Sequence, residues 1–242
     1  MARQKKLQQL AEDWEKALAV VAHPDDLEYG AASAVARWTS EGKHVSYLLV
    51  TRGEAGIDAM SPEQTGPLRE EEERASAALV GVNTVEFLDH RDGVIEYGLP
   101  LRLDIARAIR RHRPEVLITI NFQLTFGGPM LNMADHRWVG LAVLDAARDA
   151  GNRWIFPELL EEELEPWNGV KMVCISGSPT PTHAVDVTDY LDQGIASLKA
   201  HRAYIENLSG HFNPEKFLRE TAAYCGKRFR CKYAVAFEVM TI

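Results

Sequence analysis

The sequence predicts an α/β protein with a Rossmann-like, mostly parallel sheet flanked by helices. Short apolar runs rich in β-branched residues alternate with longer amphipathic stretches, which is typical of parallel strands covered by helices on both faces. The connections between these runs are long enough for crossovers. Because 242 residues fit one large domain more easily than two small ones, we expect a single domain over residues 1–242. A helix and a strand at the C-terminal end are expected as a small addition to it.

The order of the expected elements follows from the positions of these runs. Strands are expected at 17–22, 44–51, 85–88, 116–120, 170–176, 183–187 and 233–240, and helices at 31–40, 67–80, 99–112, 189–207 and 214–225. Asp189 is expected to be the N-cap of the helix over 189–207. An amphipathic pattern over 3–16 predicts a helical extension over residues 1–16. The acidic run 158–165 is expected to be a solvated helix or loop face, and 121–135 a long loop after the fourth strand.

Composition limits the class of protein. The formal net charge of -8 disfavours binding to nucleic acid, and a small neutral or cationic substrate fits better. There is no apolar run of about 18 residues and no apolar signal segment, so neither a membrane span nor secretion is expected. The three cysteines match no zinc knuckle and are expected to be reduced packing residues. These features predict a cytoplasmic location.

The first strand leads into the turn His23-Pro24-Asp25-Asp26, followed by Leu27, Glu28, Tyr29 and Gly30. A dinucleotide-binding protein would have a glycine-rich turn here, and two adjacent carboxylates would repel a pyrophosphate. An imidazole and carboxylates at the carboxyl end of a strand instead favour a cation. Imidazole and carboxylate groups are suitable ligands for a catalytic zinc ion, which usually has three protein ligands.

The third ligand is expected after the fourth strand, where Asp135-His136-Arg137 precedes a helical stretch. The first and fourth strands of many doubly wound sheets are neighbours, and ligands bind in the crevice between their carboxyl ends. We therefore predict one zinc ion held by His23, Asp26 and His136. Asp25 then remains as the general base that takes a proton from the attacking water of an amide hydrolysis.

These residues carry a resemblance to the PIG-L (LmbE-like) zinc-dependent N-deacetylases. The turn 22–28 is similar to the family's first motif, and 135–137 is similar to its later metal motif. The segments 51–56, 87–93 and 182–188 are similar to family segments and occur in the family's order. The resemblance covers roughly residues 17–240.

The resemblance implies a Rossmann-like zinc fold with His23, Asp26 and His136 as ligands and Asp25 as general base. It also implies N-acetylated amino sugars or their conjugates as substrates, with Arg52, Glu54 and Asp92 at the substrate pocket or supporting the active site, and a possible homo-oligomer. The family commonly has a histidine that stabilises the oxyanion where this chain has Met133. Because a methionine has no polar hydrogen to donate, we predict that His183 takes this catalytic role, with Arg52 as second candidate.

Several structural interpretations stand beside these functional ones. Arg52 and Glu54 could form a local surface ion pair, Asp92 could be a turn residue, and His183 a packed histidine. Alternative functions are an amidase that cleaves a larger conjugate, or a catalytically weakened metal-binding homologue. A Rossmann oxidoreductase is a more distant alternative.

Overall fold

The structure, a computed structural model, describes residues 6–208 and 212–242. Its framework is an eight-stranded sheet with the strand order β1-β9-β10-β8-β5-β2-β3-β4. β10 is antiparallel to both of its neighbours, and all the other pairs are parallel. The predicted mostly parallel sheet is therefore confirmed. Its strands are β1 (Gln8–Gln9), β2 (Lys16–Val21), β3 (His44–Leu49), β4 (Thr84–Phe87), β5 (Val116–Ile120), β8 (Met172–Ser176), β9 (His183–Asp186) and β10 (Ala234–Thr241).

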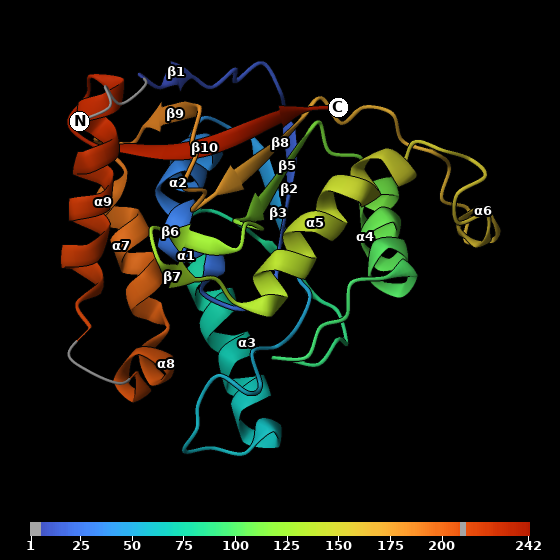
Figure 1. Cartoon of the computed structure of the whole chain (residues 1–242), viewed down its shortest axis with the longest axis horizontal. Coiled ribbons are helices and arrows are strands. Elements are labelled where there is room, and N and C mark those ends of the chain that lie inside the picture. The colour runs from blue at the N-terminus through green and yellow to red at the C-terminus, as the bar shows by residue number, and fades with distance from the viewer. Residues whose placement is uncertain (1–5, 209–211) are drawn as a thin grey trace.

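Helices cover both faces of the sheet (Figure 1). One face is covered by α4 (Leu99–His112) and α5 (Ala134–Asp149), and the other by α1 (Asp26–Gly30), α2 (Ala32–Ser40) and α3 (Pro62–Leu79). α7 (Leu191–Ala200) packs on α2 and α3. Two helices follow α7: α8 (Arg202–Asn207), which contacts α3, and α9 (Pro214–Phe229), which packs on α7, β9 and β10. The short α6 (Glu158–Glu161) lies at the far end of the molecule.

The central strands are buried on both faces, which explains why they read as continuous apolar runs. In β2, Leu18 and Val20 belong to the core under α4 and α5, whereas Ala19 and Val21 belong to the core under α2 and α3. Successive side chains of a strand point to opposite faces, so a strand covered by helices on both sides is apolar at every position. β2 pairs directly with β5, as the sequence predicted for the first and fourth strands.

The prediction of an N-terminal helix is wrong over the part of it that the structure describes, residues 6–16. This segment is extended, and its only regular element before β2 is β1, which adds an edge strand beside β9. Leu7, Leu10 and Trp14 are buried, and they have the spacing of the apolar face of an amphipathic helix. Tertiary packing, including the edge-to-face contact of Trp14 with Trp38, decides the conformation instead. Residues 1–5 of the predicted extension lie outside the described residues.

The helix expected over 189–207 is two helices, α7 and α8, which meet at His201. Asp189 is not its N-cap: the N-cap is Tyr190, with no side-chain capping bond. The break leaves His201 fully buried, with a backbone φ of -76° and ψ of 59°. The predicted continuous helix is therefore interrupted at His201, whose side chain is buried in the core.

Three other expectations concern the loops and cysteines. The glutamates of 158–165 are exposed around a single buried residue, Leu159, as predicted. The loop 121–135 contains a short hairpin of β6 (Thr125–Gly127) and β7 (Met130–Leu131) that the sequence did not indicate. All three cysteines are free thiols. No helix in the described part of the chain has the length and hydropathy needed to cross a lipid bilayer.

Candidate metal centre and active-site cavity

Three predicted residues come together where the turn after β2 meets the start of α5. One ligand atom each from His23, Asp26 and His136 lies within 4.8 Å of the others, and all three side chains are buried. Asp26 Oδ1 lies 3.1 Å from His136 Nε2, and Asp26 Oδ2 lies 3.7 Å from His23 Nδ1. This convergence follows from the pairing of β2 with β5, which places both carboxyl ends at one edge of the sheet.

Each of these side chains is oriented by a second contact on its far side. The backbone N–H groups of Ala22 and His23 donate to Asp26 Oδ2 at 3.0 and 2.9 Å. Asn132 Oδ1 lies 3.1 Å from His136 Nδ1. These contacts leave Asp26 Oδ1 and His136 Nε2 directed toward each other, as two ligands of one ion would be.

His23 is oriented by carboxylates. Its Nε2 lies 3.0 Å from Asp92 Oδ1 and 3.2 Å from Asp135 Oδ2, which leaves Nδ1 on the side of Asp26. Asp135 in turn accepts hydrogen bonds from the backbone N–H groups of Gly93 and Ile95 at 2.7 and 3.2 Å. A ligating histidine whose other nitrogen donates to a carboxylate is a common arrangement in metal sites, and it fixes the ring tautomer.

The electrostatics of the cluster follow from burial and from these contacts. Burial by itself would lower the pKa of His23, but its bonds to Asp135 and Asp92 and the charge of Asp26 raise it to about 10. Burial would raise the pKa of Asp26, but His136 and His23 lower it to about 2. The carboxylate is therefore held ionised, which is the form that binds a cation.

Asp25 is held in an unusual backbone conformation beside this cluster. Its φ of 84° and ψ of -18° lie in the left-handed region, which is uncommon for a residue other than glycine. Glu73 Oε2 accepts the Asp25 backbone N–H at 3.1 Å, and Arg69 Nη2 donates to Asp25 Oδ2 at 2.7 Å and to the Pro24 carbonyl at 2.6 Å. Burial raises the pKa of Asp25 to about 6, against the lowering effect of Arg69. The side chain is thus fixed at the cluster without being part of it.

Below the turn lies a buried polar group formed by Glu28, Glu73 and His201. His201 Nε2 lies 3.8 Å from Glu28 Oε2 and 3.6 Å from Glu73 Oε2. Burial lowers the pKa of His201, but Glu28 and Glu73 raise it to about 9, while burial and the charge of Glu28 raise the pKa of Glu73 well above its usual value. Because Glu73 also accepts the Asp25 N–H, this group supports the turn from within the core.

The loop after β3 leaves room for Arg69. A Cβ atom built on Gly53 would lie 2.7 Å from Arg69 Nη1, and one built on Gly56 would lie 2.4 Å from it. The guanidinium is buried and packs 4.1 Å from the centroid of the Tyr204 ring, so it has little space in which to move. The glycines of the segment 51–56 therefore keep the guanidinium against Asp25.

We expect Gly56→Ala to lower turnover, because the added methyl group displaces Arg69 from Asp25. Loss of an orienting contact of this kind is expected to cost about tenfold or more in kcat. Metal content and the Tm, measured by elemental analysis and calorimetry, should change little by comparison. Gly98→Ala is the control, since its Cβ atom would meet nothing closer than 3.7 Å. Equal kcat values for the two variants would show that Arg69 does not orient Asp25.

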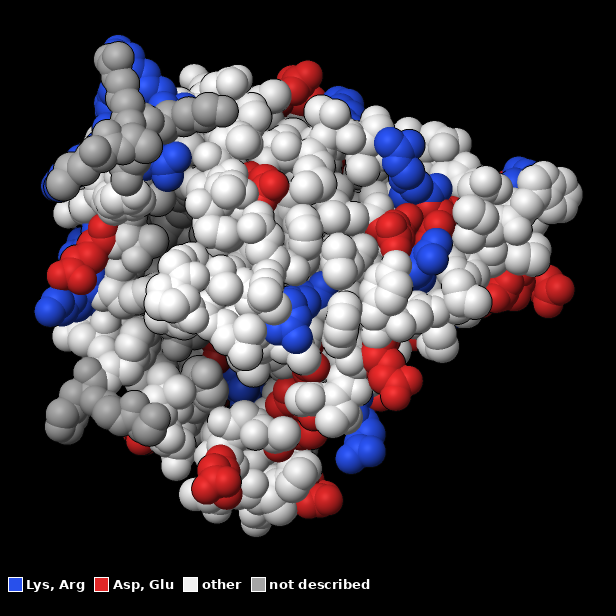
Figure 2. All heavy atoms as spheres, viewed as in Figure 1, with Lys and Arg blue, Asp and Glu red and all other residues white. Residues whose placement is uncertain are grey.

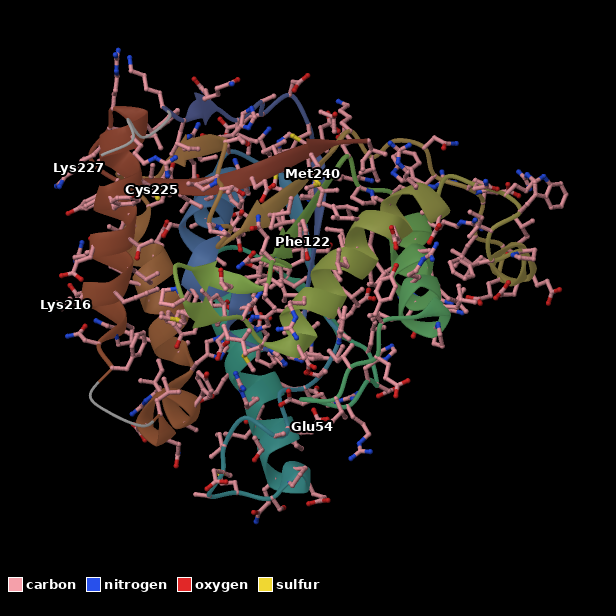
Figure 3. All side chains as sticks on the ribbon, viewed as in Figure 1. Glu54, Phe122, Lys216, Cys225, Lys227 and Met240 are labelled. Carbon is pink, nitrogen blue, oxygen red and sulfur yellow. The ribbon has the colours of Figure 1, made fainter. Side chains whose placement is uncertain are left out.

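A cavity of about 930 Å³ opens onto the cluster. Among the predicted site residues, His23, Asp25, Asp26, Asp92 and His136 line it, as does Met133. The predicted substrate residues Arg52 and Glu54 do not. Arg52 pairs with Glu70 and Asp89, while Glu54 accepts the backbone N–H groups of Asp92 and Arg52 and lies in the loop beside α3 (Figure 3).

The structure does not support the oxyanion role predicted for His183. This residue is not part of the cavity lining, and its ring contacts the hydroxyl of Thr182 at 2.8 Å. The register pairs His183 with Phe237, so the two side chains share a face of the sheet, and Phe237 is in the core under α2. Arg52, the second candidate, is likewise outside the lining.

Sequence reasoning missed the residues that support the cluster. Arg69 and Glu73 are four residues apart on a helix rich in charge, a pattern typical of a solvated face, yet both are buried. Asn132 and Asp135 had one local signal, their position within four residues of His136. His201 had none, because its partners lie far away in the sequence.

Comparisons with known proteins point to one family. A family profile described as GlcNAc-PI de-N-acetylase (PIG-L) matches residues 18–147, more than half of the chain. Diacetylchitobiose deacetylase from Thermococcus kodakarensis is 28% identical over 225 residues, covering 92% of this chain and 82% of the relative. 1D-myo-inositol 2-acetamido-2-deoxy-alpha-D-glucopyranoside deacetylase from Acidothermus cellulolyticus is 28% identical over 233 residues, covering 78% of this chain and 79% of the relative.

Solved structures show the same fold. N,N'-diacetylchitobiose deacetylase from Pyrococcus horikoshii superposes with a TM-score of 0.85 at 24% identity, covering 95% of this chain and 85% of that one. A conserved protein from Thermus thermophilus superposes with a TM-score of 0.75 at 26% identity, covering 92% and 93%. With more than half of its length matched by the family profile, and with the first and later motifs assembled into one buried cluster, the chain belongs to the PIG-L family.

Proposed function

We propose that this chain is a metal-dependent N-deacetylase that hydrolyses the acetamido group of an N-acetylated amino sugar or its conjugate. The observation that carries the proposal is the convergence of His23, Asp26 and His136, whose ligand atoms lie within 4.8 Å of one another, with the carboxylate of Asp25 beside them. Membership of the PIG-L family and the deacetylase relatives support the choice of reaction and of amino sugars as the substrate class.

The donor set fits a zinc ion. Two imidazole nitrogens and one carboxylate oxygen are the ligands of many catalytic zinc sites, and the remaining nitrogen of each imidazole is oriented by Asn132 or by Asp135 and Asp92. When bound, the ion polarises the amide carbonyl and lowers the pKa of a water molecule to about 7.

The protein's own groups then carry the proton. Asp25 accepts a proton from the water whose oxygen attacks the carbonyl carbon, and Arg69 and Glu73 keep it within reach. The C–N bond breaks as the protonated Asp25 returns this proton to the leaving nitrogen. The products are acetic acid and a free amine, which transfer a proton to become acetate and an ammonium group, so the reaction consumes one water molecule and needs no other reactant.

The oxyanion requires a donor that Met133 lacks. Met133 lines the cavity but has no polar hydrogen. Tyr204 lines the same cavity, and its pKa is raised by burial and by the charge of Asp25, so its hydroxyl keeps its proton. We assign Tyr204 as the donor in place of His183.

We expect Tyr204→Phe to lower turnover by about a hundredfold to a thousandfold, since loss of one oxyanion donor costs about 2.7 to 4 kcal/mol. The ring stays in place over Arg69, so the Tm and metal content should be preserved. His183→Ala is the control and should keep turnover close to that of the wild type. The reverse ranking of the two variants would restore the role first predicted for His183.

The proposed activity is tested with zinc-loaded protein on a panel of methyl glycosides of N-acetylated amino sugars, with release of acetate as the readout. We expect hydrolysis that stops after removal of the metal by a chelator and returns when zinc is added back. Binding of these compounds without any acetate release would favour the weakened metal-binding homologue. Hydrolysis confined to large conjugates would favour the alternative amidase. The single domain, the cytoplasmic location and a homo-oligomeric state stay predictions.

A further inference from the structure

The cavity has two chemically different parts. At the cluster it is polar, with His23, Asp25, Asp26, Asp92 and His136. Away from the cluster its walls are largely apolar and come from separate elements, the hairpin β6–β7 and the inner side of α9. A volume of about 930 Å³ is near the upper end of small-molecule sites, so the space exceeds what an acetamido group and one sugar ring need.

The hairpin provides one apolar wall that begins at the metal centre. The Phe126 ring contacts the His136 ring edge-on, with centroids 5.8 Å apart. Met130 lies further along the same hairpin and lines the cavity although its own side chain is largely exposed. In Figure 2 the surface over β6 and β7 is mostly uncharged, whereas charged side chains lie over α9, α4 and α6, around α3 and near the start of α5.

Aromatic residues provide the opposite wall. Burial and then the charge of Asp25 raise the pKa of Tyr29, and its ring contacts that of Phe217 with 5.8 Å between centroids. Phe217 begins a row of cavity-lining residues on α9 that includes Leu218, Ala222 and Cys225. Figure 3 shows the lysines Lys216 and Lys227 on the outer side of this helix, while Cys225 faces the sheet.

The charged side chains that line the cavity lie mainly at the cluster, and Arg228 lines it near the C-terminal end of α9. Of the basic groups near the metal centre, Arg69 is already paired with Asp25 and the Pro24 carbonyl. Transfer of apolar surface from water to these walls is favourable by about 25 cal/mol per Å², whereas a charged group would lose its hydration there.

We propose that the substrate carries an uncharged apolar group beside its N-acyl group, and that this group binds between the β6–β7 hairpin and α9. The inference rests on the proposed deacetylase function, because it places the amide at the cluster. The apolar group belongs either to the aglycone of the amino sugar or to a long acyl chain.

Two pairs of compounds distinguish these sources. The first pair is the methyl and hexyl glycosides of N-acetylglucosamine, and the second is the N-acetyl and N-hexanoyl forms of the methyl glycoside. A fully buried methylene contributes about 0.8 kcal/mol, so a partly exposed wall should still give at least about a tenfold gain in kcat/KM across one pair. A gain in the first pair identifies an apolar aglycone, and a gain in the second identifies a long acyl chain.

Binding is measured in parallel so that the inference does not depend on turnover. The same pairs are titrated calorimetrically into zinc-loaded Asp25→Asn protein, and a Kd that is at least about tenfold lower for the longer member supports the proposal. Equal affinities and equal kcat/KM values within both pairs overturn it. If the wild type hydrolyses the short members but shows no higher kcat/KM or affinity for the longer ones, the apolar subsite alone is refuted. If binding depends on chain length but the wild type hydrolyses none of the compounds, the deacetylase function alone is refuted.

A matched pair of hairpin variants locates the subsite. Met130 is 64% exposed and lines the cavity, while its neighbour Leu131 is 66% exposed and does not. We expect Met130→Ser to reduce the preference for the longer compound several-fold, and Leu131→Ser to leave that preference at the wild-type ratio. An equal effect of both variants would show that the apolar group does not bind at this wall.

Discussion

Asp25→Asn is expected to lower turnover by about a hundredfold to ten-thousandfold, the range typical for loss of a general base. Asparagine keeps the shape of the side chain but cannot accept the proton from the attacking water. Arg69 can still donate to its amide oxygen, and the backbone bond to Glu73 is unchanged. Metal content, measured by elemental analysis, should therefore equal that of the wild type.

Asp26→Asn separates the two adjacent aspartates. Asp26 has one oxygen tied by the N–H groups of Ala22 and His23 and the other directed at His136. A neutral amide at this position binds a cation less tightly, so this variant should lose metal as well as activity. If Asp25→Asn and Asp26→Asn lost metal to the same extent, the division between base and ligand would be wrong.

His136→Ala is expected to give the largest loss of metal. It removes a ligand atom outright, and even loss of an orienting contact to a ligand typically costs about tenfold to a hundredfold in metal affinity. We therefore expect a decrease of more than about a hundredfold in zinc affinity, measured by competition with a chelating indicator, and turnover near background at low zinc concentration.

Asn132→Ala provides the graded comparison for His136→Ala. Asn132 contacts His136 Nδ1 at 3.1 Å and is not one of the three predicted ligands. Removal of the Asn132 amide should lower the zinc affinity by about tenfold to a hundredfold, which is less than the loss expected for His136→Ala. Zinc affinity that stays the same after His136→Ala would remove His136 from the ligand set and leave the third ligand to be found elsewhere.

The sequence was enough to predict that the candidate ligands and Asp25 lie close together, because each motif is local. His23, Asp25 and Asp26 follow one strand directly, and His136 begins the helix after a neighbouring strand. Parallel strands of such a sheet end at one edge, so the order of elements was enough to bring the two motifs together. The boundaries of β5 and α4 were likewise predicted to the residue, since apolar periodicity defines them.

The residues predicted less well depend on register and burial. His183 and Arg52 are polar residues near strand ends, as His23 is, and nothing in the sequence indicates on which side of the sheet each lies. The pairing of His183 with Phe237 directs it away from the cavity, and Arg52 turns toward Glu70 and Asp89. The sequence also did not indicate that the charged residues Arg69 and Glu73 of α3 are buried. Their partners come from the turn after β2 and from the junction between α7 and α8.

The sequence by itself determined the fold class, the family and the set of candidate metal ligands, because apolar alternation and short motifs are properties of neighbouring residues. Only the tertiary structure decided what orients those ligands, what holds Asp25 in its left-handed conformation and what lines the cavity. Each of these depends on contacts between residues far apart in the chain, such as Asp25 with Arg69 and Tyr29 with Phe217. Such contacts are fixed by close packing in three dimensions, which no local pattern of residues records.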